Sequence, residues 1–197
     1  MANILIDLLP STVEINGEEY EINSDFRTSL LFSQLVEDDE VDNMEKIGLA
    51  LELYYKIIPN NINEAINKII CFYKCDKEIK QSNGKSNGKS NGTVKNEKIL
   101  DYEEDADYIY SAFLSQYNID LNDIEDLHWW KFKSLLNGLK EDNKIVEIMK
   151  YRSIDLSKIK DKEQRKFYKE MKDLYKLDVK LSDDDLLELK ELSKEWK

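Results

Sequence analysis

The stretch that decides the fold class is Leu127-His128-Trp129-Trp130-Lys131-Phe132-Lys133-Ser134-Leu135-Leu136-Asn137-Gly138-Leu139. Its large apolar residues are Trp129, Phe132, Leu136 and Leu139. They recur at spacings of three and four, which is the period of an amphipathic helix. Gly138 stands in a C-cap position near the end of this pattern, and we expect Asp123 to cap its start. The stretch therefore predicts a strong helix with a wide apolar face.

The same helical period recurs on both sides of this stretch. Apolar residues follow it between residues 30 and 35, 44 and 55, 62 and 73, 106 and 117, 145 and 149, 167 and 174, and 186 and 196. One segment differs, because apolar and polar residues alternate on either side of Asn16-Gly17, a dipeptide that tolerates the positive φ angles of a hairpin turn. We therefore predict a mainly α protein with a short N-terminal β-hairpin, so that only the N-terminus is α+β.

Residues 82–93 interrupt the helical pattern with a repeated four-residue unit, SNGK-SNGK-SNGT. Glycine and asparagine favour turns over helix, so the segment is interpreted as a flexible tether. It is either a linker that lets two halves move or an insertion into a tolerant surface loop. The predicted division is residues 1–79 for the hairpin and first helices, 80–98 for the tether, 99–180 for a second helical region and 181–197 for a short amphipathic terminal helix.

Composition limits the partners of the chain. It has 197 residues with 41 acidic and 29 basic side chains, so its net charge is −12. Such a charge repels phosphate backbones and anionic lipids, which disfavours nucleic acid and membranes as partners. No apolar stretch approaches the roughly 18–20 residues of a spanning helix, and the interrupted apolar start at residues 1–7 is a poor signal peptide. We expect a soluble intracellular protein.

Charge is unevenly distributed along the chain. Residues 1–60 carry 13 acidic and 3 basic side chains, and residues 101–143 carry 11 and 3. Residues 144–180 instead carry 7 acidic and 12 basic side chains. Such a surface can pair head to tail with a copy of itself, acid to base, and we expect a homo-oligomer. The alternative is that these charges are simply solvated.

Residues with catalytic or metal-binding chemistry are scarce. His128 is the only histidine and has no recognisable nucleophile motif beside it, so a partly buried structural histidine is the simpler interpretation. Cys71 and Cys75 share a helix face but lack the further ligands of a closed zinc site, and we expect reduced thiols. The acidic run at 103–107 suits the first turns of a helix, where carboxylates face the positive end of the dipole. We predict no catalytic residues, no cofactor, no metal site and no enzyme activity.

Aromatic residues are the first candidates for contacting a protein partner. Trp129, Trp130 and Phe132 resemble an interface hot spot, although such a stripe is more often part of a core. Trp196 lies on the predicted terminal helix, whose packing partner the sequence does not identify.

Basic residues are the second candidates. They form a stripe on the predicted helix over residues 158–177, in which Lys162, Arg165 and Lys169 are the central members. This stripe could contact a protein partner or, as a weaker alternative, nucleic acid. Interleaved acidic residues and the net charge of −12 argue against nucleic acid.

Several stretches together resemble one known family. They are DYEEDADYIY at 101–110, FLSQY at 113–117, LHWWKFK at 127–133, LNGL at 136–139, YRSIDLS at 151–157 and KEQR at 162–165. In this order, and with the N-terminal hairpin, they are similar to the bacteriophage gene product fifteen family of tailed phages and prophages of Gram-positive bacteria. The resemblance spans about residues 5–177, while the SNGK tether and the end beyond Asp178 depart from the family pattern.

The resemblance implies a role in building a phage tail. Genes of this family lie near those of the major tail protein and the tape measure protein, and the role implied is that of a tail assembly chaperone without catalytic residues. We therefore expect the tape measure protein and the tail-tube protein as partners, action in the host bacterial cytoplasm, and absence from the mature virion. The alternatives are a structural component of the tail or, less favoured, a nucleic-acid-binding phage protein.

Overall fold

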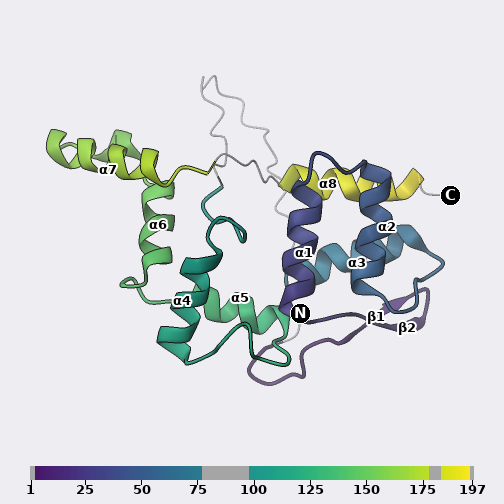
Figure 1. The fold of residues 1–197 in the computed structure, drawn as a ribbon. Coiled ribbons are helices and arrows are strands. Elements are labelled where there is room, and N and C mark those ends of the chain that lie inside the picture. Colours follow the sequence, from purple (N-terminus) through teal and green to yellow (C-terminus); the bar gives the residue numbers. More distant parts are fainter. Residues whose placement is uncertain (1–2, 77–97, 178–182, 196–197) are drawn as a thin grey trace. The chain divides into compact units, whose positions relative to one another are not determined.

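Figure 1 shows the chain as a computed structural model, which describes residues 3–76, 98–177 and 183–195. Within these ranges it has eight α-helices and one two-stranded antiparallel sheet, which confirms the predicted mainly α fold with an N-terminal β-hairpin. The strands are β1 (Thr12–Ile15) and β2 (Glu18–Glu21), and the 3-10 helices are η1 (Leu156–Lys158) and η2 (Ser193–Glu195). The α-helices are α1 (Phe26–Glu37), α2 (Asn43–Tyr54), α3 (Ile62–Tyr73), α4 (Ala106–Tyr117), α5 (Trp129–Asn137), α6 (Lys144–Ser153), α7 (Lys162–Leu174) and α8 (Asp183–Leu192).

The hairpin turn is the one that its sequence predicts. Asn16 and Gly17 have φ angles of 53° and 81°, and Ile15 pairs with Glu18 across the two-residue turn. Asparagine and glycine reach this left-handed region with little strain, and such turns match the twist of the strands they join. Local sequence is therefore sufficient to determine this element.

The described residues form two compact units, each of which combines separate segments of the chain. Unit 1 takes its described residues from 1–23, 39–96 and 182–197, and unit 2 takes them from 24–38 and 97–181. This grouping differs from the predicted division by sequence order, because α1 belongs to unit 2 and α8 to unit 1. The predicted tether at 80–98 lies outside the described residues except for Lys98.

Unit 1 is built around α3. Helix α3 packs against α2, α8 and β1, because its apolar residues recur on one face and are fully buried there. The core side chains are Ile15, Ile47, Leu51, Tyr54, Ile66, Ile69 and Leu189. Leu189 comes from α8, so the sequence-predicted terminal helix finds its partner in α2 and α3. Asn43 Nδ2 donates to Glu188 Oε1 at 2.9 Å, which adds a hydrogen bond to the contact between α2 and α8.

Unit 2 has an aromatic core centred on α5. The ring of Phe132 stacks on three other rings, with centroid distances of 4.9 Å to Phe26, 5.1 Å to Phe113 and 5.6 Å to Trp129. These rings come from α1, α4 and α5, so one cluster joins three helices that are distant in sequence. Stacked aromatic pairs bury large apolar areas and favour definite geometries, which makes this cluster the organising element of unit 2.

The helix at α5 begins later than the sequence predicts. His128, not Asp123, is the N-cap residue, and its imidazole Nδ1 accepts a hydrogen bond from Trp130 N at 3.0 Å. The preceding backbone is engaged elsewhere, because Leu127 O accepts from Phe26 N at 2.9 Å and Trp129 N donates to Ser24 O at 2.7 Å. A backbone paired across to the start of α1 cannot also form helical hydrogen bonds, so Asp123 does not cap a helix.

The acidic run at 103–107, predicted to form the first turns of a helix, is helical only from Ala106, where α4 begins. Asp101 instead caps a separate turn, in which its Oδ1 accepts from the N–H groups of Glu103 and Glu104 at 2.8 Å each. A carboxylate that accepts two local N–H groups stabilises a turn outside the helix, as aspartate commonly does. The acidic run is therefore divided between this turn and the first turn of α4.

Candidate partner-binding surface

The aromatic residues proposed as a partner-binding group lie inside unit 2. Trp129 is 0% exposed, and Trp130 and Phe132 are also buried. The Trp129 and Phe132 rings belong to the core between α1, α4 and α5, and the Lys133 ammonium lies over the Trp129 ring at 5.2 Å. Side chains in this position cannot contact a partner while unit 2 stays folded. Trp196, the other aromatic candidate, lies outside the described residues.

His128 has a structural position in this part of the chain. It is buried, and the nitrogen that caps α5 is an acceptor and therefore carries no proton in this geometry. Its ring lies edge-on to Trp130 at a centroid distance of 5.8 Å. The structure thus uses the single histidine to start a helix.

A buried ion pair that the sequence analysis did not detect joins three segments of unit 2. The Arg152 guanidinium donates to both carboxylate oxygens of Asp105, at 2.5 and 2.9 Å, and also to Ile99 O and Tyr175 O. Both side chains are buried. All three guanidinium nitrogens donate, with four hydrogen bonds in total, so this pair holds α4, α6 and the end of α7 together. Its two members are 47 residues apart, and no local pattern reveals such a pair.

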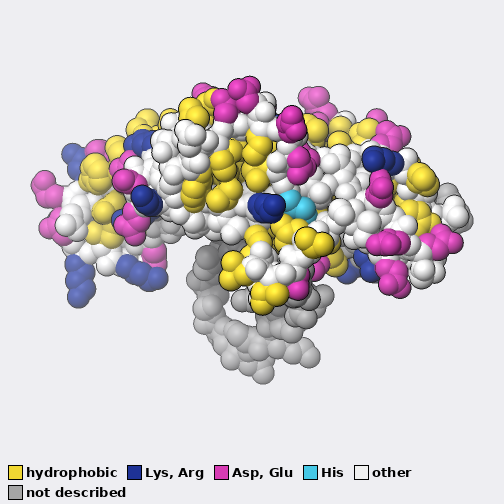
Figure 2. Space-filling view, turned by 90° about the horizontal axis from the view of Figure 1, so that it is seen from below, with side chains coloured by type: hydrophobic (Ala, Val, Ile, Leu, Met, Phe, Trp, Pro, Cys, Tyr) yellow, Lys and Arg dark blue, Asp and Glu magenta, His cyan; other side chains and the backbone are white. Residues whose placement is uncertain are grey.

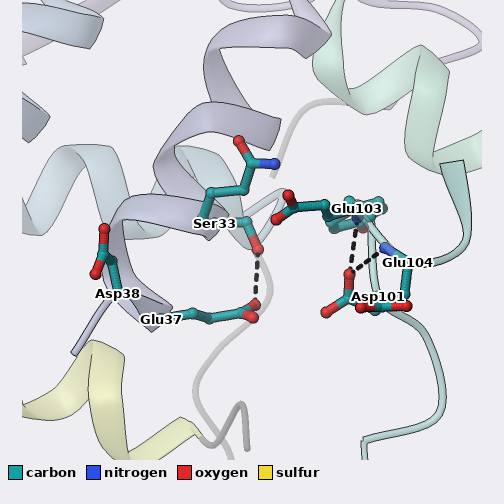
Figure 3. Close-up of a pocket in the computed structure, with 8 residues that line it drawn as sticks. Ser33, Glu37, Asp38, Asp101, Glu103 and Glu104 are labelled. Carbon is teal, nitrogen blue, oxygen red and sulfur yellow. Dashed lines mark hydrogen bonds between the residues drawn. The ribbon is translucent and has the colours of Figure 1, made fainter. Parts of the chain in front are cut away.

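Acidic residues line a hollow of about 370 Å³ in unit 2, shown in Figure 3. The Ser33 hydroxyl points to Glu37, and Asp101 points to the backbone of Glu103 and Glu104. Beside this hollow, the Lys98 ammonium donates to Glu37 Oε2 and Asp101 Oδ2 at 2.6 Å each. The hollow therefore has its own compensating cation.

The two carboxylates that share Lys98 respond differently to this environment. Burial raises the pKa of Glu37 above its usual value, even though Lys98 opposes this change. Burial also acts to raise the pKa of Asp101, but the Lys98 ammonium and the N–H groups of Glu104 and Glu103 together lower that pKa below its usual value. Within the described residues, no group of three or more His, Cys, Asp or Glu side chains is placed to hold a metal ion.

Helix α7 differs from the other described helices of unit 2 because none of its residues is buried. Helical spacing places Phe167, Met171 and Leu174 along one side, which we call the apolar face of α7. Phe167 is 47% exposed and Leu174 is 67% exposed, while Met171 is half-buried. An amphipathic helix normally buries its apolar face, whereas the described residues leave this one largely uncovered at Leu174 and half covered at Phe167.

The basic candidates occupy the opposite side of the same helix. Lys162, Arg165 and Lys169 are all exposed, and the Arg165 guanidinium donates to Ile159 O at 2.9 Å. Figure 2 shows Lys and Arg side chains interleaved with Asp and Glu side chains at its left end, where α7 lies in Figure 1. These side chains continue the basic stripe expected from the sequence, with acidic side chains of the same helix beside it.

Aromatic contacts hold α7 against α6 at one edge. The Tyr151 ring meets Phe167, Tyr168 and Tyr175 at centroid distances of 6.2, 6.1 and 6.0 Å. These contacts cover the tyrosine edge of α7 and leave the Leu174 end open. The helix is thus positioned by α6, and Phe167 and Leu174 of its apolar face stay exposed among the described residues.

The fold and its surfaces define a class: an acidic, mainly helical protein of two units that presents an amphipathic helix. The model of the family described as Bacteriophage Gp15 protein matches residues 5–177, so the chain belongs to this family and is a bacteriophage protein. This confirms the resemblance noted in the sequence. No curated protein and no solved structure matches the chain. Among the described residues, every helix is too short or too polar to cross a membrane.

Proposed function

We propose that this protein is a tail assembly chaperone, which binds the tape measure protein and keeps it soluble until the tail tube forms. Membership of the Bacteriophage Gp15 family supports the phage context. The observation that carries the proposal is α7, a 13-residue amphipathic helix without a buried residue on a chain with a net charge of −12. It combines a surface for an apolar client with charge that keeps a complex dispersed.

Helix α7 suits a helical client. Its 13 residues extend about 20 Å, and one helix can pack its apolar stripe along another over such a length. A tape measure protein is a long helical chain whose apolar stripes are uncovered before tube subunits surround it. The apolar face of α7 would cover one such stripe, and many copies would cover the chain.

The remaining parts of the proposal follow from this role. Tail-tube subunits would displace the chaperone as they polymerise, so it acts in the host bacterial cytoplasm and is absent from the mature virion. No catalysis, cofactor, membrane or nucleic acid is required. The alternative, a structural tail component, predicts stoichiometric copies in purified particles, and quantitative mass spectrometry of those particles separates the two functions.

Co-expression with the tape measure protein of the same genetic element tests the proposal. The wild-type chain is expected to bring the tape measure protein into the soluble fraction and to co-purify in many copies. The double variant Phe167→Asp/Leu174→Asp is expected to lose this effect, because charges replace the apolar face of α7. Leu31→Asp is the matched control, since Leu31 is an exposed apolar residue on α1 of the same unit.

The basic side of α7 provides a second control. Lys162→Gln/Lys169→Gln alters that side and leaves the apolar face intact, so capture of the tape measure protein should persist. If the tape measure protein stays insoluble with the wild-type chain, the chaperone function is wrong. Equal capture by wild type and by Phe167→Asp/Leu174→Asp would instead remove α7 as the binding surface.

A further inference from the structure

Carboxylates border the apolar face of α7. Glu163 lies one helical turn before Phe167, and Glu170 lies one turn before Leu174. Side chains four residues apart are neighbours on a helix surface, so each of these exposed apolar side chains has a carboxylate beside it. Both glutamates are exposed. A partner that meets Phe167 and Leu174 therefore meets two negative charges at the same time.

The other edge of the apolar face is occupied by contacts with α6. There the rings of Tyr168 and Tyr175 lie 6.1 and 6.0 Å from the ring of Tyr151. A partner thus reaches the apolar face from the edge that carries the glutamates. Exposed charges farther apart than about 8 Å are largely screened at physiological salt, so the charge on this edge selects among partners.

The basic residues of α7 leave this edge acidic. Lys162, Arg165 and Lys169 lie on the opposite side of the helix. Lys166 lies beyond Glu170, with its ammonium 4.0 Å from Glu170 Oε1, and the two side chains are 79% and 60% exposed. An exposed pair at this distance is weak, so it does little to neutralise the edge.

We propose that α7 selects a helical client segment in which lysine or arginine borders the apolar stripe. This inference rests on the proposed chaperone function and adds the chemistry of the segment that the apolar face recognises. Apolar side chains of the segment would cover Phe167 and Leu174, and its basic side chains would lie against Glu163 and Glu170. Complementary charges at the border of an apolar contact speed association and exclude wrong partners.

The same arrangement disfavours segments with acidic borders. Like charges that are placed side by side at the border of a contact weaken binding. Each copy of this chain has a net charge of −12, so a second copy is disfavoured as the occupant of the face as well. The face would therefore stay open until a basic amphipathic segment reaches it.

Two synthetic helical peptides test this selection. Both carry the same leucine stripe, which is bordered by lysines in one peptide and by glutamates in the other. Fluorescence anisotropy measures the binding of each labelled peptide to the purified full chain at about 0.15 M salt, where distant charges are screened. The wild type is expected to bind the lysine peptide more tightly than the glutamate peptide, and Phe167→Asp/Leu174→Asp should bind neither.

Charge reversal isolates the two glutamates. Glu163→Lys/Glu170→Lys should weaken binding of the lysine peptide about tenfold and strengthen binding of the glutamate peptide, because two exposed charge pairs change from attraction to repulsion. The matched control is Glu125→Lys/Asp126→Lys. It makes the same change in net charge at exposed residues of unit 2 outside α7, and it should keep the wild-type preference.

A milder variant guards against a disturbed helix. Glu163→Gln/Glu170→Gln keeps good helix formers at both positions and should show a preference between those of the wild type and the charge-reversal variant. Circular dichroism should show the same helicity in all variants, because the substituted side chains are exposed.

Several results would overturn the proposal. The wild type could bind neither peptide or show no preference, or both glutamate variants could keep the wild-type preference. A control variant that loses the preference as fully as the charge-reversal variant would assign the preference to net charge. Sedimentation of the chain alone could also reveal a dimer that Phe167→Asp/Leu174→Asp loses, which would assign the face to a second copy.

These outcomes are separate from the test of the chaperone function. Capture of the tape measure protein without any peptide preference would keep that function and remove the selection by charge. Preference for the lysine peptide, together with a tape measure protein that stays insoluble, would keep the selection by α7 and remove the chaperone function.

Discussion

Helices α5 and α7 carry the two groups of residues that the sequence marks as partner-binding candidates, and the fold treats them in opposite ways. Helix α5 has Trp129, Trp130, Phe132 and Leu136 buried among its nine residues, whereas α7 has no buried residue among thirteen. Both have an apolar face at helical spacing. The difference is that α1 and α4 supply aromatic rings that cover α5, while α7 meets α6 along one edge only. An apolar stripe in the sequence therefore identifies a helix face that is favourable to bury. It does not show which segment or molecule buries that face.

The largest expected effect comes from removing the fully buried Trp129 ring of the covered helix α5. Trp129→Ala should lower the free energy of unfolding by about 3–5 kcal/mol, because it leaves a cavity in a packed aromatic core. Phe167→Ala, the same kind of change on the uncovered helix, should cost less than about 1 kcal/mol. Urea denaturation followed by circular dichroism measures both, and equal losses would contradict the contrast between α5 and α7.

Arg152→Met should be nearly as severe. It leaves the Asp105 carboxylate buried without its cation, and loss of one partner of a buried pair costs about 3–5 kcal/mol. The double variant Arg152→Met/Asp105→Asn should recover part of that loss, because the uncompensated charge is gone. This pair also ties the end of α7 to unit 2, so proteolysis near Tyr175 should accelerate in Arg152→Met. An unchanged cleavage rate would show that the aromatic edge alone positions α7.

His128→Ala tests the start of the covered helix. Loss of the acceptor for Trp130 N should cost about 1 kcal/mol, as loss of other N-cap side chains does. His128→Asn keeps a capping oxygen and should cost clearly less. Thermal denaturation of the two variants compares them, and equal melting temperatures would mean that packing against Trp130, rather than capping, is the contribution of His128.

The smallest expected effect concerns the carboxylates beside Lys98. Because the folded-state pKa of Asp101 is lowered, its contribution to stability is present above the ordinary aspartate pKa and is lost as the pH falls through the folded value. Glu37 has a raised pKa, so its contribution is present below the ordinary glutamate pKa and is lost as the pH rises through the folded value. Asp101→Asn should therefore flatten the acid side of the stability profile, and Glu37→Gln should not. Denaturation curves between pH 3 and 6 measure these slopes, and identical slopes in both variants would contradict the assignment.

Much of the local structure could be predicted because short-range physics determines it. The Asn16-Gly17 turn and the end of α5 at Gly138 both depend on neighbouring residues. The two late helix starts could not be predicted, because distant backbone pairing engages the segment before Trp129 and a local Asx-type turn engages Asp101. Capping patterns state where a helix can begin, and competing hydrogen bonds decide where it does.

By itself the sequence determined the mainly α class, the hairpin, the acidic charge and the family to which this bacteriophage protein belongs. Only the tertiary structure decided that α1 joins unit 2 and α8 joins unit 1, that Arg152 pairs with Asp105, and that the tryptophan stretch is core while α7 is surface. The physical reason is the distance along the chain over which each effect acts. Periodicity and turn chemistry act over a few residues, whereas burial depends on which distant segments supply the covering side chains.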